Sequence, residues 1–196
     1  MITAGFIGLG LIGGSIARAF KKNCPGIHIT AYNRSPEPLA RAVSDGIVDT
    51  PVHEVGSGFG DCDIIFLCTP VEHNLTYLSL LKNIIKPGCI ITDVGSVKGY
   101  IHRMVHDLGM EECFIGGHPM AGSEKTSYTY ANDRLVENAY YAITPTDAVS
   151  KERVEEFTEI VQGIGAIPIN ISYPLAYYIS LYAPEKTILI PTMHYE

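Results

Sequence analysis

Apolar runs and helix-period segments alternate along the first 171 residues of the chain. Short, continuous apolar runs are typical of buried strands, and apolar residues repeating every three or four positions are typical of amphipathic helices. Ile12, Ile16 and Phe20, for example, would share one helix face. The pattern predicts strands at 4–7, 27–32, 63–68, 89–94, 113–115, 140–144 and 166–171, and helices at 11–22, 37–44, 71–85, 97–108, 132–138 and 151–164.

Strands that alternate with helices in this way predict βαβ units around a parallel sheet. We therefore expect an α/β fold over residues 1–171, a doubly wound, mostly parallel sheet of the Rossmann type that forms one dinucleotide-binding domain. Residues 172–196 differ, because they hold five of the twelve tyrosines and show neither strand nor helix periodicity. We interpret them as an atypical tail.

Composition narrows the function classes. Of 196 residues, 46% are hydrophobic and 18% charged, as in ordinary globular proteins, and the net charge of −7 argues against a nucleic-acid partner. The apolar runs are too short to span a membrane, and the first residues do not resemble a signal peptide, so the cytoplasm is the expected location. Five cysteines without a Cys-x-x-Cys pair predict small buried side chains rather than disulfides.

A glycine-rich turn, Gly8-Leu9-Gly10-Leu11-Ile12-Gly13, follows the first predicted strand and opens the first predicted helix. This context is typical of a dinucleotide site. Gly8 would permit the tight turn, Gly10 would let the backbone approach a pyrophosphate, and Gly13 would let helix and strand pack closely. Leu11 and Ile12 would place the helix N-terminus at the phosphates.

The end of the second predicted strand bears on the choice of cofactor. An acidic residue there would normally bind the ribose 2′-hydroxyl of NAD. Here Asn33 is neutral and Arg34 cationic, followed by Ser35, so a 2′-phosphate would be tolerated. The residues favour NADP only slightly, and both NAD and NADP stay open.

His118 is the candidate base, in the segment Gly116-Gly117-His118-Pro119-Met120-Ala121-Gly122-Ser123-Glu124. Pro119 would hold His118 extended, and the glycines around it would let a flat substrate or nicotinamide come close. A histidine can accept a hydroxyl proton while hydride leaves the same carbon. Because ligands bind beyond the carboxyl ends of parallel strands, we expect one crevice ringed by five strand ends. These are Gly8, Asn33, Thr69 with Pro70, Gly95 and His118.

Other polar residues near these strand ends have less specific roles. Ser96 is expected to cap the N-terminus of the helix at 97–108, and it would also bond the nicotinamide, the substrate or His118. Lys98 is expected to be an exposed helical lysine rather than a carboxylate ligand, and Glu124 either gates the pocket or is solvated. His102 and His106 have metal-ligand spacing, but without a third ligand we expect a solvated helix face and no metal.

At these residues the chain resembles the prephenate/arogenate dehydrogenase family of tyrosine biosynthesis. The matching segments are 8–15 (GLGLIGGS), 93–98 (DVGSVK), 116–124 (GGHPMAGSE) and 137–145 (ENAYYAITP). The resemblance implies an NAD(P)-dependent oxidoreductase that converts prephenate to 4-hydroxyphenylpyruvate by oxidative decarboxylation. It also implies His118 as the base, Ser96 as its orienting partner, and Ser123 and Glu124 as substrate or gating residues.

The resemblance stops near residue 171. Members of the family continue into a helical domain that forms homodimers and supplies substrate-binding residues, whereas 172–196 look like its truncated or frame-shifted start. We therefore expect the chain to bind cofactor but to turn over poorly alone. Three alternatives remain: an arogenate dehydrogenase, a 3-hydroxyacid dehydrogenase of the hydroxyisobutyrate type, and a non-catalytic nucleotide-binding fragment.

Overall fold

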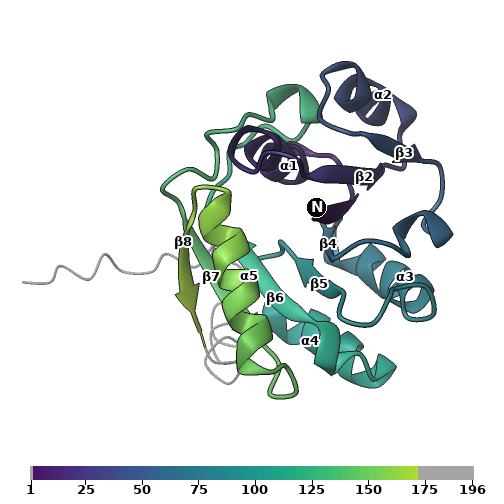
Figure 1. Ribbon diagram of the computed structural model, residues 1–196, viewed down its shortest axis with the longest axis vertical. Coiled ribbons are helices and arrows are strands. Elements are labelled where there is room, and N and C mark those ends of the chain that lie inside the picture. The colour runs from purple at the N-terminus through teal and green to yellow at the C-terminus, as the bar shows by residue number, and fades with distance from the viewer. Residues whose placement is uncertain (1, 172–196) are drawn as a thin grey trace, which may run out of the picture.

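The computed structural model describes residues 2–171 (Figure 1), and the tail at 172–196 lies outside the described residues. The strands are β1 Thr3–Ile7, β2 His28–Tyr32, β3 Thr50–Val52, β4 Ile64–Leu67, β5 Ile90–Asp93, β6 Ile115–Pro119, β7 Tyr140–Pro145 and β8 Ile167–Asn170. The helices are α1 Leu11–Asn23, α2 Pro36–Ser44, α3 Val71–Leu81, α4 Lys98–Leu108 and α5 Lys151–Gly163. Three short 3₁₀ turns are η1 Ser57–Phe59, η2 Glu111–Cys113 and η3 Tyr128–Tyr130.

Five parallel strands form the first sheet, in the order β3-β2-β1-β4-β5. The next strand, β6, lies beside β5. A parallel bridge between Ile91 of β5 and Phe114, the residue before β6, joins the two. Strands β6, β7 and β8 form a second, three-stranded sheet. The strand order reverses at β1, where ligands bind in open α/β sheets. The doubly wound Rossmann prediction is confirmed.

Alternate residues of the central strands face two separate cores. In β4, Ile64 and Phe66 join the core beneath α1, α2 and α5, whereas Ile65 and Leu67 join the core beneath α3 and α4. Figure 1 shows α3 and α4 side by side, well apart from α1. A strand covered on both faces has no solvent side, which explains why these strands read as unbroken apolar runs.

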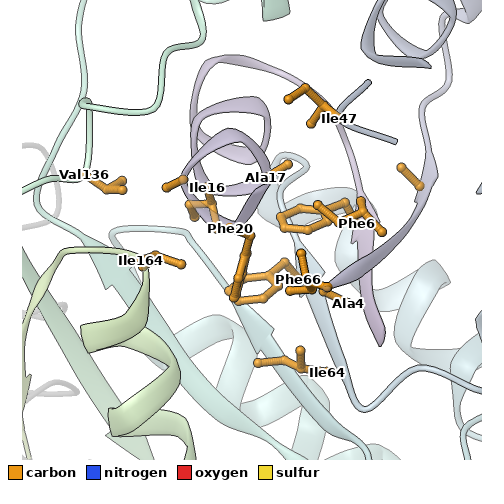
Figure 2. Close-up of a cluster of buried hydrophobic side chains, with 14 of the residues drawn as sticks. Ala4, Phe6, Ile16, Ala17, Phe20, Ile47, Ile64, Phe66, Val136 and Ile164 are labelled. Atoms are coloured by element: carbon orange, nitrogen blue, oxygen red, sulfur yellow. The ribbon is translucent and has the colours of Figure 1, made fainter. Parts of the chain in front are cut away.

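Three phenylalanines fix helix α1 against the sheet (Figure 2). The rings of Phe6 and Phe66 are stacked with centroids 5.1 Å apart, and the Phe20 ring meets both edge-on. Burial of each side chain contributes about 2 kcal/mol to folding. This packing holds the N-terminus of α1 at the carboxyl end of β1, beside the glycine turn.

The main errors of the sequence prediction lie in the second half of the domain. The strand expected at 113–115 runs instead from Ile115 to Pro119, because Gly116 and Gly117 are part of the ladder with β7. The helix expected at 132–138 is absent, and these residues form turns with Asn138 at φ 58°. Strand β7 pairs antiparallel with β6. In the first half, the one strand that was not predicted is the short edge strand β3.

Candidate functional site

The glycine turn is shaped by close contacts within the protein. Gly8 has φ +101°, and a side-chain carbon there would lie 2.9 Å from the Cys68 carbonyl oxygen. At Gly13 such a carbon would lie 2.9 Å from Cys68 Cβ and closer still to the carbonyl oxygen of Gly8. Gly10 differs, because its nearest neighbour would be the Thr126 oxygen at 3.7 Å. Packing therefore requires Gly8 and Gly13, while Gly10 borders open space.

Helix α1 begins directly after this turn with its backbone donors uncapped. Gly10 is the N-cap residue and supplies no side-chain hydrogen bond, and the first turn of the helix contains no acidic residue. The first N–H groups of a helix have no partner within it, and the helix dipole is positive at this end. The arrangement can bind an anion such as a phosphate.

Asn33 ties the end of β2 to the glycine turn. Its Oδ1 accepts a hydrogen bond from the Leu9 backbone N–H at 2.8 Å, and its Nδ2 donates to the Ser35 carbonyl oxygen at 2.8 Å. Sequence reasoning assigned Asn33 to the ribose and missed this bracing role. The signal was present in the residue type, because an Asn beside a turn often bonds nearby backbone.

A cavity of about 400 Å³ opens over the glycine turn. It gathers seven of the predicted cofactor residues, namely Gly8, Gly10, Asn33, Arg34, Ser35, Thr69 and Pro70. Also in its lining are Leu9, Pro38, Cys68, His73, Tyr77, Thr126, Ser127 and Tyr128. No carboxylate lines it, although the chain as a whole is acidic, and Arg34 adds a positive charge. The cavity suits a ligand that carries phosphate.

Four predicted cofactor residues lie outside that lining. Leu11, Ile12 and Gly13 form the first turn of α1, and Gly95 follows β5. Within the lining, Thr69 donates its hydroxyl to Asn74 Oδ1 at 2.7 Å, and Pro70 is the N-cap residue of α3. Thr69 and Pro70 thus shape the wall at the end of β4.

His118 lies on β6, opposite Ala142 of β7. Because β6 runs parallel to β5, His118 is at the same edge of the fold as the glycine turn. The imidazole is partly buried, which lowers its pKa to about 4, and the charge of Lys98 acts in the same direction while Asp93 opposes it. A neutral imidazole at pH 7 can accept a proton. We expected five strand ends to ring one crevice. The cavity over the glycine turn is lined by three of them, and Gly95 and His118 are not among its lining residues.

Lys98 is buried, so the expectation of an exposed helical lysine is wrong. Its Nζ lies 2.5 Å from Asp93 Oδ2 and donates a second hydrogen bond to the Gly117 carbonyl oxygen at 2.7 Å. Burial lowers the pKa of Lys98, and the Asp93 carboxylate opposes that shift. Asp93 also accepts hydrogen bonds from the backbone N–H groups of Gly95 and Gly117. The pair joins the end of β5 to the strand that carries His118.

Gly116 and Gly117 serve this polar cluster rather than an approaching ligand, which corrects the role expected for them. A side-chain carbon at Gly117 would lie 2.7 Å from the Asp93 carbonyl oxygen and 2.8 Å from the Tyr141 hydroxyl. At Gly116 it would lie 2.9 Å from His102 Nε2. A side-chain carbon at Gly122, in contrast, would have no neighbour within 4 Å, so Gly122 borders open space.

The remaining predicted residues of the chemical site are exposed. Ser96 is not the N-cap of α4, because the helix begins one residue later and Val97 occupies that position. The prediction failed because the turn after Gly95 takes one more residue than the serine pattern suggests. Ser123 and Glu124 lie on an exposed loop after β6, where Ser123 Oγ accepts a hydrogen bond from the Lys125 backbone.

His102 and His106, which are four residues apart on α4, lie in different environments. His102 is buried, which corrects the expectation of a solvated face: burial lowers its pKa to about 4, and its Nε2 lies 3.4 Å from Thr144 Oγ1. His106 is exposed and pairs with Glu111, which raises its pKa. Among residues 2–171 there is no group of three or more His, Cys, Asp or Glu placed to hold a metal ion.

Sequence reasoning missed several cavity residues, because the chain brings them from distant segments. His73 and Tyr77 come from α3, and Thr126, Ser127 and Tyr128 come from the loop after β6. Tyr77 gave no pattern beyond an aromatic residue in a helix. The small residues Gly14 and Ser15, which follow the glycine turn, were the one available sign that another segment packs there. Both contact the segment after β6.

Comparison with known proteins identifies the family. The family model described as the nucleotide-binding domain of prephenate dehydrogenase matches residues 16–170. The chain belongs to the prephenate dehydrogenase family. Prephenate dehydrogenase of Bacillus subtilis is 38% identical over 167 residues, which are 84% of this chain and 45% of the relative. The chain therefore spans less than half the length of that prephenate dehydrogenase.

Solved structures agree with this assignment. A prephenate dehydrogenase from Aquifex aeolicus, in complex with hydroxyphenyl propionate and NAD+, matches with a TM-score of 0.82 and 30% identity, over 92% of this chain and 63% of that one. An arogenate dehydrogenase from Synechocystis matches with a TM-score of 0.80 and 32% identity, over 87% and 60%. The predicted resemblance is confirmed, in preference to the 3-hydroxyacid dehydrogenase alternative. None of the helices within residues 2–171 is long and apolar enough to cross a bilayer.

Proposed function

We propose that this chain is the dinucleotide-binding part of an NAD(P)-dependent prephenate dehydrogenase. The observation that carries the proposal is the cavity over the glycine turn, which lies at the uncapped N-terminus of α1 and has no carboxylate in its lining. Asn33 and Arg34 replace the acidic residue that selects NAD, so the proposal includes NADP as the slightly preferred cofactor. The bound nicotinamide would accept hydride from the substrate.

In the proposed mechanism His118 acts on the hydroxyl at C4 of the prephenate ring. Neutral His118 would accept the hydroxyl proton while C4 loses its hydride, so that C4 would become a carbonyl. The bond between C1 and the ring carboxylate then breaks and carbon dioxide departs. The electron pair of the broken bond stays with the ring and makes it aromatic. His118 returns the proton to the phenolate oxygen, which completes 4-hydroxyphenylpyruvate. Aromatisation drives the loss of carbon dioxide.

The Lys98–Asp93 pair supports this role by its contacts. It fixes Gly117, the residue before His118, and its ammonium adds to the effect of burial in keeping the imidazole unprotonated. Ser96 and Gly95 lie at the end of β5, beside the strand of His118, where they would meet the nicotinamide side of the cofactor. Ser123 and Glu124 would face the substrate from the exposed loop. Prephenate and arogenate both remain compatible with these residues.

Calorimetric titration of the purified chain with NAD+ and NADP+ tests the binding half of the proposal. We expect saturable binding of at least one of the two, and the absence of both would contradict it. Prephenate-dependent formation of NADH or NADPH tests the chemical half, with arogenate as the competing substrate. Light scattering tests whether the chain forms the homodimer that the resemblance implies for members of the family.

A further inference from the structure

A segment far from the glycine turn in sequence lies against it in the fold. Residues Thr126–Asn132, which we call the strap, run beside α1, where η3 contacts both α1 and α2 (Figure 1, the teal-green segment near α1). Tyr128 at its centre is buried. A side-chain carbon at Gly14 would lie 2.7 Å from the Tyr128 ring and 2.8 Å from Ala131 Cβ. Gly14, which the dinucleotide pattern does not require, is therefore needed for the strap to pack.

Polar contacts anchor the outer part of the strap. Arg18 donates a hydrogen bond to the Tyr128 hydroxyl at 3.0 Å, and its guanidinium lies 4.9 Å from the centre of that ring. The Tyr128 hydroxyl donates in turn to Asp45 at 3.3 Å. Further along, Ser15 Oγ accepts a hydrogen bond from the Asn132 backbone at 3.0 Å. The strap is thus held in place by α1 at two separate points.

The first residues of the strap border the cavity. Thr126 and Ser127 belong to its lining, and the Thr126 carbonyl oxygen is the nearest atom to the open space at Gly10. Within the described part of the chain, the Thr126 hydroxyl makes no hydrogen bond. The Ser127 hydroxyl makes only long ones to Thr129, at 3.3 and 3.4 Å. The Thr126 hydroxyl therefore has its donor left for a ligand. The single hydroxyl proton of Ser127 is donated to Thr129 Oγ1 at 3.4 Å, and rotation of the hydroxyl would exchange this long hydrogen bond for one to a ligand.

We propose that the strap is a wall of the nucleotide site, in which Thr126 and Ser127 donate hydrogen bonds to the diphosphate of the bound dinucleotide. The proposal rests on the proposed function. Gly10 and the α1 N–H groups would contact the diphosphate from one side, and the strap lies across the open space at Gly10. Hydroxyl donors complement phosphate oxygens, and hydrogen bonds to a charged acceptor are the strong ones.

This arrangement also links the two halves of the site. The strap follows directly after the loop that carries Ser123 and Glu124, which itself follows His118. A diphosphate held by Thr126 and Ser127 would therefore restrain the loop proposed to face the substrate. Cofactor binding would position that loop without any contact between the cofactor and Glu124.

The test compares the double variant T126V/S127A with the wild-type chain by calorimetry. The ligands NAD+, NADP+ and ADP-ribose share the diphosphate. Adenosine lacks the diphosphate and serves as the reference ligand, and its binding is measured by NMR titration. We expect the double variant to bind the three diphosphates about ten-fold or more weakly, with adenosine unchanged. Y130F is the matched control, because Tyr130 lies in the strap but is exposed and does not line the cavity. It should stay within about two-fold of wild type.

Two results would overturn the proposal. If wild type binds NAD+ or NADP+ and the double variant matches it, the strap does not contact the diphosphate, while the proposed function stands. If wild type binds none of the diphosphates, the proposed function fails and the strap proposal fails with it. Because Ser127 also caps η3, T126V alone is the second variant. If S127A disturbs folding, an unchanged affinity in T126V overturns the proposal in the same way.

Discussion

The Lys98 ammonium and the Asp93 carboxylate form a buried ion pair, with 2.5 Å between Nζ and Oδ2. The same ammonium bonds the carbonyl oxygen of Gly117, so one side chain holds both the end of β5 and the residue that precedes His118. A buried pair of this kind contributes little to net stability, because desolvation offsets the attraction. The role of the pair is to position the imidazole, because it holds the residue before His118 in place.

Replacing Lys98 alone should strongly destabilise the domain. In K98M the Asp93 carboxylate stays buried without its cation, which costs about 3–5 kcal/mol of unfolding free energy. The double variant D93N/K98M should recover part of that loss, because no buried charge remains. Urea unfolding measures both, and K125M, at an exposed lysine, is the control. A K98M domain as stable as the wild type would contradict the buried pair.

His118 should remain neutral well below the ordinary range of histidine. Burial lowers its pKa to about 4, whereas pairing with Glu111 raises the pKa of His106. In an NMR pH titration the His118 ring signals should move only near the bottom of the accessible range, and those of His106 should move above pH 6.5. A His118 midpoint at 6.5 or higher would contradict the burial of the ring.

The same shift predicts a direction for stability against pH. The folded-state pKa of His118, about 4, lies below the unfolded value of about 6.5, so the unfolded chain binds more protons between these limits. Stability should therefore fall as pH decreases from 6.5 to 4, and His102, with the same pKa, adds to the fall. The urea midpoint of unfolding should change less with pH across this window in H118N than in wild type. Equal slopes would count against this account.

Asn33 should matter to nucleotide binding through the turn that it braces. In N33A the Leu9 N–H loses its acceptor, and cofactor affinity should fall about five-fold, as a lost hydrogen bond of about 1 kcal/mol implies. N33D keeps an acceptor for Leu9 but adds a negative charge at the ribose. It should retain NAD+ while binding NADP+ at least ten-fold more weakly. Calorimetry with both cofactors separates the two effects.

The glycines of the turn should respond differently to a single methyl group. G13A forces a carbon against Cys68 and the Gly8 backbone, so we expect a loss of about 1–3 kcal/mol or more in stability. G10A has room at 3.7 Å and should cost no more than about 1 kcal/mol. Because Gly10 borders the cavity, G10A should nevertheless bind cofactor poorly. Thermal unfolding and calorimetry on the same samples distinguish stability from binding.

The first half of the fold was predictable because its signals are local. Runs such as Ile64–Leu67 are apolar on both faces and read directly as a covered strand. The glycine turn between a strand and a helix similarly predicts its own geometry. The residues that build this half of the site lie at strand ends, which the order of elements alone places together.

The second half could not be predicted, because its determinants are distant contacts. The burial of Lys98 depends on Asp93 and on β6, and nothing in the helical pattern marks that lysine as internal. Tyr128 meets Arg18 across 110 positions of sequence, so no local pattern marks the strap as a packed segment. Gly116 and Gly117 were expected to leave room for a substrate or nicotinamide, whereas Gly117 lets the strand approach Asp93.

The junction between β5 and β6 has one further consequence. Within residues 2–171 these strands share a single bridge, and the Asp93 side chain supplies an acceptor for Gly117 where a continuous ladder would use backbone. The last three strands are therefore attached mainly through side chains, since Ile115, Tyr141 and Ile143 lie in the same buried cluster as Phe6 and Phe66. The proposed base is thus positioned by side-chain contacts at this junction, whereas the glycine turn follows a strand held on both sides by backbone ladders, so a substitution at Asp93 can displace the base while the chain still holds nucleotide.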